Sequence, residues 1–139
     1  RRCGWLDLVA LKYGARINGL TGLVVTKLDA LSGLGELGVA VRYKGPEGAI
    51  FEQFPYHQTM VHKARADYEM MPGWDEDIGG ARTLDELPQN ARNYLDFISD
   101  FIGVPIVLVG VGPARDQVIW TGRGAQRYVP VPAPSTQPA

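Results

Sequence analysis

The stretch from Leu20 to Asp29 reads Leu-Thr-Gly-Leu-Val-Val-Thr-Lys-Leu-Asp. Its first seven residues carry no charge, are partly β-branched and are apolar on both faces, which is typical of a buried strand in a parallel sheet. Lys27 and Asp29 follow directly, at the carboxyl end of that predicted strand. Open α/β sheets bind their ligands at this edge. The stretch therefore predicts both a class of fold and the place of a site.

Helix and strand patterns alternate along the rest of the chain. Apolar side chains recur at helical spacing over 5–16 and again over 88–103, which favours two helices packed on a core. Short apolar runs predict strands at 37–43, 105–109 and 117–120, with 49–54 as a hairpin partner of the first. The order helix, strand, hairpin, helix, strand indicates an α/β fold.

One region between the predicted elements shows no periodic pattern. Residues 55–70 mix polar and apolar side chains without a clear period, and Met71 to Trp74 is typical of a turn because it contains Pro-Gly. The acidic segment 75–77 that follows lacks the spacing of a calcium-binding loop. We therefore predict no element over 55–70 and expect the acidic segment 75–77 to be a solvated loop.

Composition narrows the class of protein. Hydrophobic residues are 45% and charged residues 21% of the 139, which is typical of a globular domain or a piece of one. The net charge of −1 argues against a nucleic-acid partner, and no apolar run is long enough to span a membrane. The single cysteine, Cys3, cannot form an internal disulfide, so we expect a cytoplasmic protein. The chain opens on Arg1 without an initiator methionine, so we expect it to be part of a longer protein.

The Lys-x-Asp pair suits recognition of guanine. Guanine presents two adjacent donors, N1–H and the 2-amino group, and the Asp29 carboxylate could accept both at once, whereas adenine lacks this pattern. The stem of Lys27 could lie along the base while its ammonium stays in water. Four residues are a short motif, so a solvated Lys and Asp after a strand is the alternative at this point.

A second candidate segment follows the other buried strand. Gly110 to Pro113 reads Gly-Val-Gly-Pro. Glycines at a strand end let backbone N–H groups approach a ligand such as the guanine O6, and a plain tight turn is the alternative. No phosphate-binding loop of the Gly-x-x-x-x-Gly-Lys-Ser/Thr type is present, so a phosphate site would lie elsewhere. His57 and His62 have no further Cys or His near them, which argues against a zinc site.

A series of stretches, in order along the chain, resembles the C-terminal part of the adenylosuccinate synthetase family. They are Arg1 to Asp7, Ile17 to Gly22, Thr26 to Asp29, Met71 to Trp74, Leu87 to Tyr94, Gly103 to Pro105 and Val111 to Pro113. The resemblance implies an α/β fold: the C-terminal part of a P-loop-NTPase-like, mixed and mainly parallel sheet with flanking helices and a small hairpin. It covers the domain at 1–123 and leaves 124–139 as a Pro-rich tail, whose composition predicts disorder.

The resemblance also implies a function. Members of the family join IMP and L-aspartate to form adenylosuccinate, the first committed step from IMP to AMP, and they use GTP and Mg²⁺. The implied nucleotide-binding residues are Arg1, Lys27, Leu28, Asp29, Gly110, Val111 and Gly112. Gly110 stands where the family commonly has Ser. The family's phosphate loop, catalytic residues and Mg²⁺ ligands lie in its N-terminal part, so we expect no catalytic or metal-binding residue here. We expect the chain alone to be inactive and the full-length enzyme to be a homodimer.

Two other classes of protein remain open at this point. A GTPase-like switch protein would also place Thr-Lys-x-Asp at a strand end, but it usually has a Ser-Ala-Lys type loop after the next strand, where this chain has Gly110 to Pro113. A non-catalytic interaction domain that uses 55–70 and the tail is the third interpretation, and no motif supports it.

Overall fold

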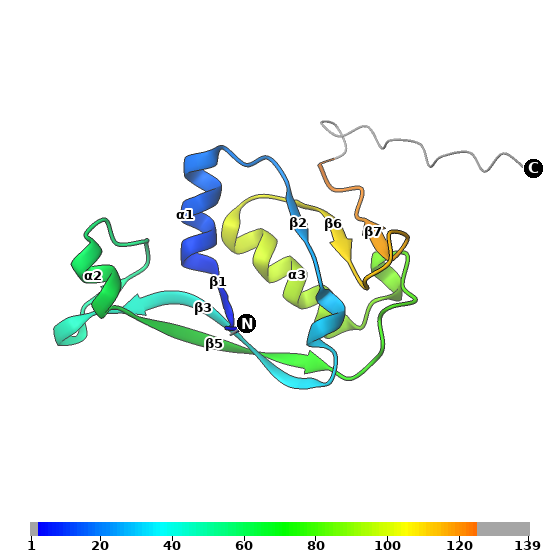
Figure 1. Cartoon of the computed structure of the whole chain (residues 1–139), viewed down its shortest axis with the longest axis horizontal. Helices are drawn as coiled ribbons and strands as arrows, with labels where there is room; N and C mark the ends of the chain where they lie inside the picture. The colour runs from blue at the N-terminus through cyan, green and yellow to red at the C-terminus, as the bar shows by residue number, and fades with distance from the viewer. Residues whose placement is uncertain (1–2, 125–139) are drawn as a thin grey trace, which may run out of the picture.

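The computed structural model describes residues 3–124, and its elements form two sheets with two long helices (Figure 1). Arg1 and the predicted tail beyond Gly124 lie outside the described residues. The strands are β1 Leu6–Asp7, β2 Leu23–Val25, β3 Leu34–Lys44, β4 Ile50–Phe51, β5 Arg65–Trp74, β6 Ile106–Gly110 and β7 Val118–Trp120. The helices are α1 Leu8–Asn18, α2 Gln58–Lys63 and α3 Gln89–Ile102, with short 3-10 turns at Leu28–Leu31, Pro46–Gly48 and Leu84–Glu86. None of the described helices is both long and apolar enough to cross a membrane.

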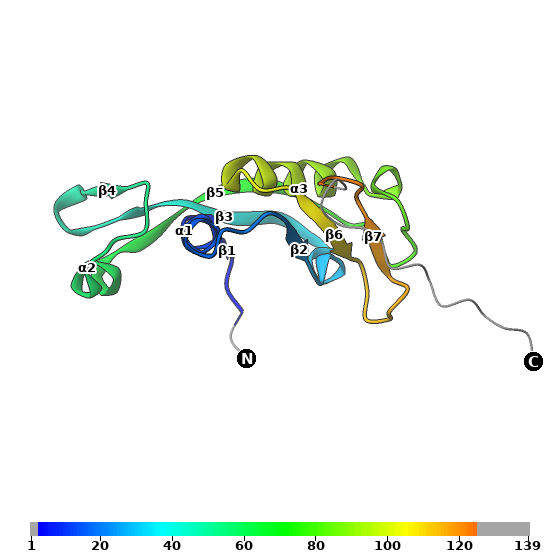
Figure 2. The ribbon, with the colours of Figure 1, turned by 90° about the horizontal axis from the view of Figure 1, so that it is seen from above.

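The larger sheet is built around β3. Its partners are β1, which runs parallel to it, and β4 and β5, which run antiparallel. The predicted hairpin partner at 49–54 is confirmed as the short strand β4, but β5 is the main partner and pairs with β3 over almost its whole length. Figures 1 and 2 show the β3–β5 ribbon extending away from α1 and α3, with β4 and α2 at its far end.

The predicted turn at Met71 to Trp74 is wrong, because these residues form the end of β5. Gly73 serves a close approach between strands: a Cβ there would lie only 1.7 Å from the carbonyl oxygen of Leu34. Pro72 stands opposite Glu36 on a strand that pairs on one side only, where a missing N–H is tolerated. Most of β5 is exposed or half-buried, so it lacks the alternation that marks a strand with one buried face.

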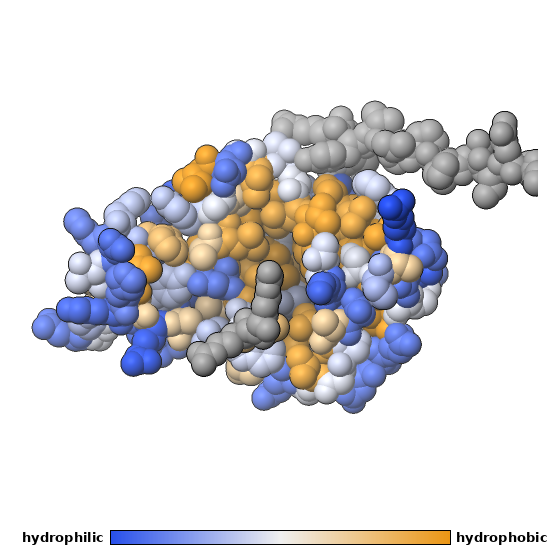
Figure 3. All heavy atoms as spheres, viewed as in Figure 1, coloured by the Kyte–Doolittle hydropathy of each residue, from blue (hydrophilic) through white to orange (hydrophobic). Residues whose placement is uncertain are grey.

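The smaller sheet has the order β2-β6-β7, with β2 parallel to β6 and β7 antiparallel to it. The strands predicted at 105–109 and 117–120 are confirmed within a residue or two. β2 is shorter than the predicted 20–26, and the side chain of Val24 is 59% exposed, so this strand buries only one of its faces. In the view of Figure 1, apolar side chains gather over the middle of the molecule (Figure 3).

The two helices begin and end for identifiable reasons. Helix α1 starts at Leu8, later than predicted, because Leu6 and Asp7 pair with β3 and the Asp7 carboxylate caps the helix by accepting from the Ala10 N–H at 2.9 Å. The other Asp7 oxygen accepts from the Tyr43 hydroxyl. Burial of Tyr43, together with this bond, raises the pKa of Tyr43. Helix α3 ends where Gly103 adopts a left-handed conformation, as predicted.

The core lies where α3 packs between the two sheets. The predicted apolar stripe of α3 is confirmed, because Tyr94, Ile98 and Ile102 are all buried. The same cluster contains Leu28, which follows β2, and Trp74, which ends β5. The core therefore joins the ends of β2 and β5, which are far apart in the sequence.

Candidate functional site

The two candidate segments meet at the ends of adjacent parallel strands. Strands β2 and β6 pair with Val25 opposite Val109, so Thr26 and Gly110 come next to each other (Figure 1). A Cβ at Gly110 would lie 3.5 Å from the Thr26 Cα and 3.7 Å from the Lys27 nitrogen. These are ordinary van der Waals distances, so a serine would fit at Gly110 without displacing the neighbouring strand.

Lys27 turns the chain sharply after β2. It has φ 60° and ψ 37°, a left-handed conformation that a residue with a side chain rarely adopts. The 3-10 turn Leu28–Leu31 follows and is closed by hydrogen bonds from the Ala30 N–H to the Lys27 carbonyl and from the Ser32 N–H to the Asp29 carbonyl. The Lys27 ammonium is exposed and has no ion-pair partner among the described residues.

Leu28 anchors this turn in the core. Its side chain is 1% exposed and belongs to the buried cluster, so only its backbone can face a ligand. The Lys27 side chain is exposed and Asp29 is half-buried. The motif thus places one residue in the core and the two on either side of it near the surface.

Asp29 carries the most informative feature of the site. Its Oδ1 atom is buried and has no hydrogen-bond partner in the part of the chain that the structure describes. An unpaired carboxylate oxygen removed from water is costly. Such an atom indicates a place where a ligand supplies the missing donor.

The loop after β6 is shaped by Gln117, which sequence reasoning had treated only as the start of a strand. The Gln117 Oε1 accepts from the Ala114 N–H, and its Nε2 donates to the Gly79 carbonyl, both at 3.0 Å. This amide crosses Gly112 so closely that a Cβ there would lie 2.3 Å from Oε1. A side chain at Gly112 would therefore have to displace the Gln117 amide from these two hydrogen bonds. The role of Gln117 in shaping this loop depends on tertiary contacts, so no sequence pattern predicts it.

The three predicted loop residues differ in what they can offer. Val111 is fully buried, and its N–H already donates to the Gln117 carbonyl at 2.9 Å. The N–H of Gly112 has no acceptor among the described residues. We therefore expect Gly112, rather than Val111, to present a backbone donor to a ligand.

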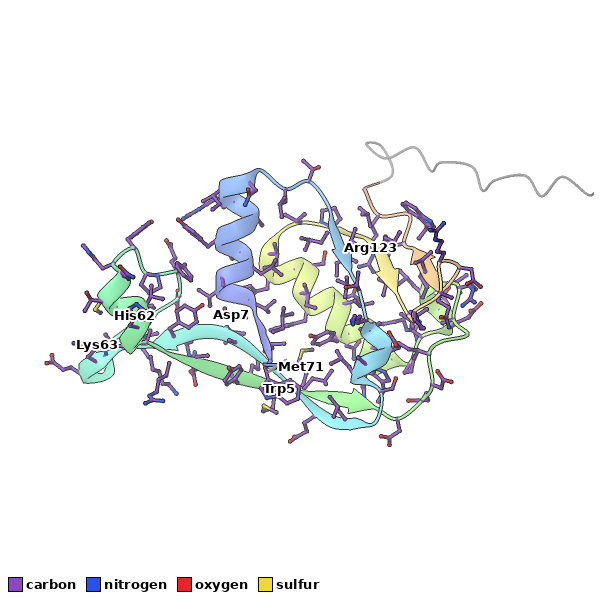
Figure 4. All side chains as sticks on the ribbon, viewed as in Figure 1. Trp5, Asp7, His62, Lys63, Met71 and Arg123 are labelled. Carbon is purple, nitrogen blue, oxygen red and sulfur yellow. The ribbon has the colours of Figure 1, made fainter. Side chains whose placement is uncertain are left out.

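The two histidines lie far from this edge. His57 and His62 are exposed; His57 precedes α2, and His62 lies on α2 at the far end of the β3–β5 ribbon, away from the β2–β6 strand ends (Figure 4). The described residues contain no group of three His, Cys, Asp or Glu side chains that could hold a metal ion.

Lys27→Gly should give a more stable fold than Lys27→Ala. Glycine adopts the left-handed conformation without the steric cost of a Cβ, so we expect the free energy of unfolding to rise by about 1 kcal/mol relative to Lys27→Ala. Urea denaturation of the two variants measures this difference. A Lys27→Gly protein no more stable than Lys27→Ala would contradict the left-handed conformation.

Residues 3–124 form an α/β fold in which two loops share the ligand edge of a parallel strand pair. The family model for adenylosuccinate synthetase matches residues 1–119, so the chain belongs to the adenylosuccinate synthetase family. This confirms the resemblance inferred from the sequence.

Individual relatives agree with this assignment. The chain is 49% identical over 119 residues to the adenylosuccinate synthetase of Acidothermus cellulolyticus, a match that covers 86% of this chain and 28% of that protein. It is 50% identical over 119 residues to the synthetase of Scheffersomyces stipitis, with 86% and 27% covered. It is 48% identical over 120 residues to a chloroplastic adenylosuccinate synthetase of Sorghum bicolor, with 86% and 24% covered. The chain spans about a quarter of the length of these curated relatives.

A solved structure shares the fold. The fully ligated adenylosuccinate synthetase from Plasmodium falciparum superposes with a TM-score of 0.82 at 39% sequence identity. The match covers 87% of this chain and 29% of that one. The expected α/β architecture is thereby confirmed.

Proposed function

We propose that this chain forms the guanine-recognition side of the GTP site in an adenylosuccinate synthetase. The whole enzyme would join IMP and L-aspartate to form adenylosuccinate while GTP is converted to GDP and phosphate. Family membership supports the overall activity. The buried, unpaired Oδ1 of Asp29 in the turn after β2, together with Gly110 beside the end of that strand, supports the role of this part of the enzyme.

The residues present fit a guanine base. The Asp29 carboxylate can accept from the N1–H and the 2-amino group, which satisfies its buried oxygen. The exposed Lys27 can cover the base with its aliphatic stem. The N–H of Gly112 is a donor of the kind that the guanine O6 requires, and Gly110 leaves room beside the β2 end. Arg1, proposed from the resemblance to contact GTP, lies outside the described residues.

The chemical steps are assigned to the rest of the enzyme. The metal, the GTP phosphates and most of the contacts to IMP would depend on the N-terminal part of the enzyme, where the resemblance places the phosphate loop, the catalytic residues and the Mg²⁺ ligands. For this reason we expect the chain by itself to form no adenylosuccinate. A homodimer, a cytoplasmic location and the absence of nucleic-acid and membrane partners stay predictions, and the Sorghum bicolor relative is named as chloroplastic.

The GTPase-like switch protein no longer has support of its own. It rested on the Lys-x-Asp pair at a strand end, which the synthetase assignment explains equally well. The family model that matches residues 1–119 is that of a synthetase. The switch alternative is therefore not proposed further.

Hydrogen exchange can locate the guanine site directly. In a full-length synthetase that carries this chain as its matching segment, saturating GDP should protect the amides of residues 27–32 and 110–114, because the base orders both loops. ADP at the same concentration is the control and should leave both segments unchanged. Protection that appears elsewhere in the chain but spares both loops would overturn the assignment.

A further inference from the structure

We propose that Trp74 and Ser32 are positioning residues that clamp the guanine-recognition turn. The inference rests on the proposed function, because it concerns how Asp29 is held. Ser32 ends the 3-10 turn that carries Asp29, and Trp74 ends β5, which the sequence separates from that turn by some forty residues. Neither residue would touch the nucleotide.

Two hydrogen bonds join the turn to Trp74. The Trp74 indole Nε1–H donates to the Ser32 Oγ at 3.0 Å, and the Trp74 carbonyl accepts from the Gly33 N–H at 2.8 Å. The Ser32 N–H in turn donates to the Asp29 carbonyl at 3.2 Å. A continuous chain of hydrogen bonds thus runs from β5 to the backbone of Asp29.

Trp74 is itself fixed to the body of the molecule. Its side chain is only 4% exposed, and its ring packs against Tyr94 of α3 with centroids 6.2 Å apart. The neighbouring carbonyl of Gly73 accepts from the Asn90 side chain at 2.7 Å. The clamp therefore fixes the turn relative to α3 and the core.

The need for a clamp follows from the unpaired oxygen of Asp29. The Asp29 carboxylate oxygen is buried without a donor. An outward movement of the turn would let water donate to this oxygen and would therefore be favourable. Hydrogen bonds to Trp74 oppose this movement. The carboxylate then stays in place before the base arrives, and binding does not have to reverse its hydration. Loss of the clamp should weaken guanine binding without changing the reacting groups.

The test uses three variants of a full-length synthetase that carries this chain: Trp74→Phe, Ser32→Ala and the double variant. Trp74→Phe keeps an aromatic ring and removes the indole N–H, and Ser32→Ala removes the acceptor. Each should raise the GTP KM by roughly 3- to 10-fold, the worth of one hydrogen bond, and leave kcat unchanged. Because both changes break the same bond, the double variant should show no further increase.

Substrate preference distinguishes positioning from a general loss of stability. Inosine triphosphate lacks the 2-amino group, so it depends less than GTP on the alignment of the Asp29 carboxylate. The preference for GTP over inosine triphosphate should therefore fall in both single variants. Trp120→Phe, the same substitution at a side chain 56% exposed on β7, is the matched control and should change neither quantity.

The outcomes separate this inference from the proposed function. If Asp29→Asn impairs GTP use while Ser32→Ala leaves the GTP KM and the GTP preference unchanged, the clamp is overturned and the guanine site stands. If Asp29→Asn also has no effect, the guanine site itself fails. A lower kcat with an unchanged GTP preference in Trp74→Phe and Ser32→Ala would mean a purely structural role and would also overturn the clamp.

Discussion

Asp29→Asn is expected to raise the GTP KM by tens- to hundreds-fold in a full-length synthetase that carries this chain. The carboxylate oxygen is buried without a partner, and the proposed base offers two adjacent donors to it. Loss of a charge-assisted bidentate pair in such a place costs about 2–4 kcal/mol of binding free energy. Asparagine keeps one acceptor and introduces one donor, so the remaining interaction with guanine includes a clash between two donors.

The same variant should accept xanthosine triphosphate better than the parent enzyme does. Xanthine has a carbonyl where guanine has its 2-amino group, so the amide of asparagine meets it with complementary donor and acceptor. Steady-state kinetics with both nucleotides measures the change in preference. Asp100→Asn, the same change at an exposed position on α3, serves as the control. An unchanged KM for GTP in Asp29→Asn would contradict the assignment of Asp29 to the base.

The meeting of the two candidate segments could be predicted because each strand end has a local signal. The strand ends at Thr26 and Gly110 follow short apolar runs, and parallel neighbours bring their carboxyl ends to one edge. The end of α3 was also predictable, because the helical spacing of its apolar residues, followed by Gly103, is itself the signal. In each case the decisive signal lies within about fifteen residues of sequence.

The features that shape the site could not be predicted in this way. Gly73 is required because the backbone of Leu34, on another strand, approaches it, and Gly112 leaves room for the Gln117 amide that crosses it. Both glycines resemble ordinary turn residues in the sequence. The clamp from Trp74 to Ser32 likewise depends on the long β3–β5 pairing. This pairing could not be predicted, because β5 has no buried face and so no alternating sequence pattern. Long-range contacts, rather than local propensity, determine these details.

Leu28→Ala is expected to lower the local free energy of unfolding by about 2–5 kcal/mol, the usual cost of removing a buried leucine side chain. Leu28 is 1% exposed and lies in the core cluster, between two residues whose side chains are partly or fully accessible. The cavity would loosen the turn that carries Asp29, so the GTP KM should rise as well. Native-state hydrogen exchange of the β6 amides measures the stability of this region in the full-length synthetase.

Leu28→Met separates the anchor from a direct role in binding. Methionine has nearly the volume of leucine and is expected to cost less than about 1.5 kcal/mol, with a GTP KM close to that of the parent. Leu34→Ala, at a side chain 38% exposed, is the matched control for Leu28→Ala and should cost clearly less. If Leu28→Met kept the stability and still raised the GTP KM strongly, the Leu28 side chain would have to contact the nucleotide, and its assignment as a core anchor would be wrong.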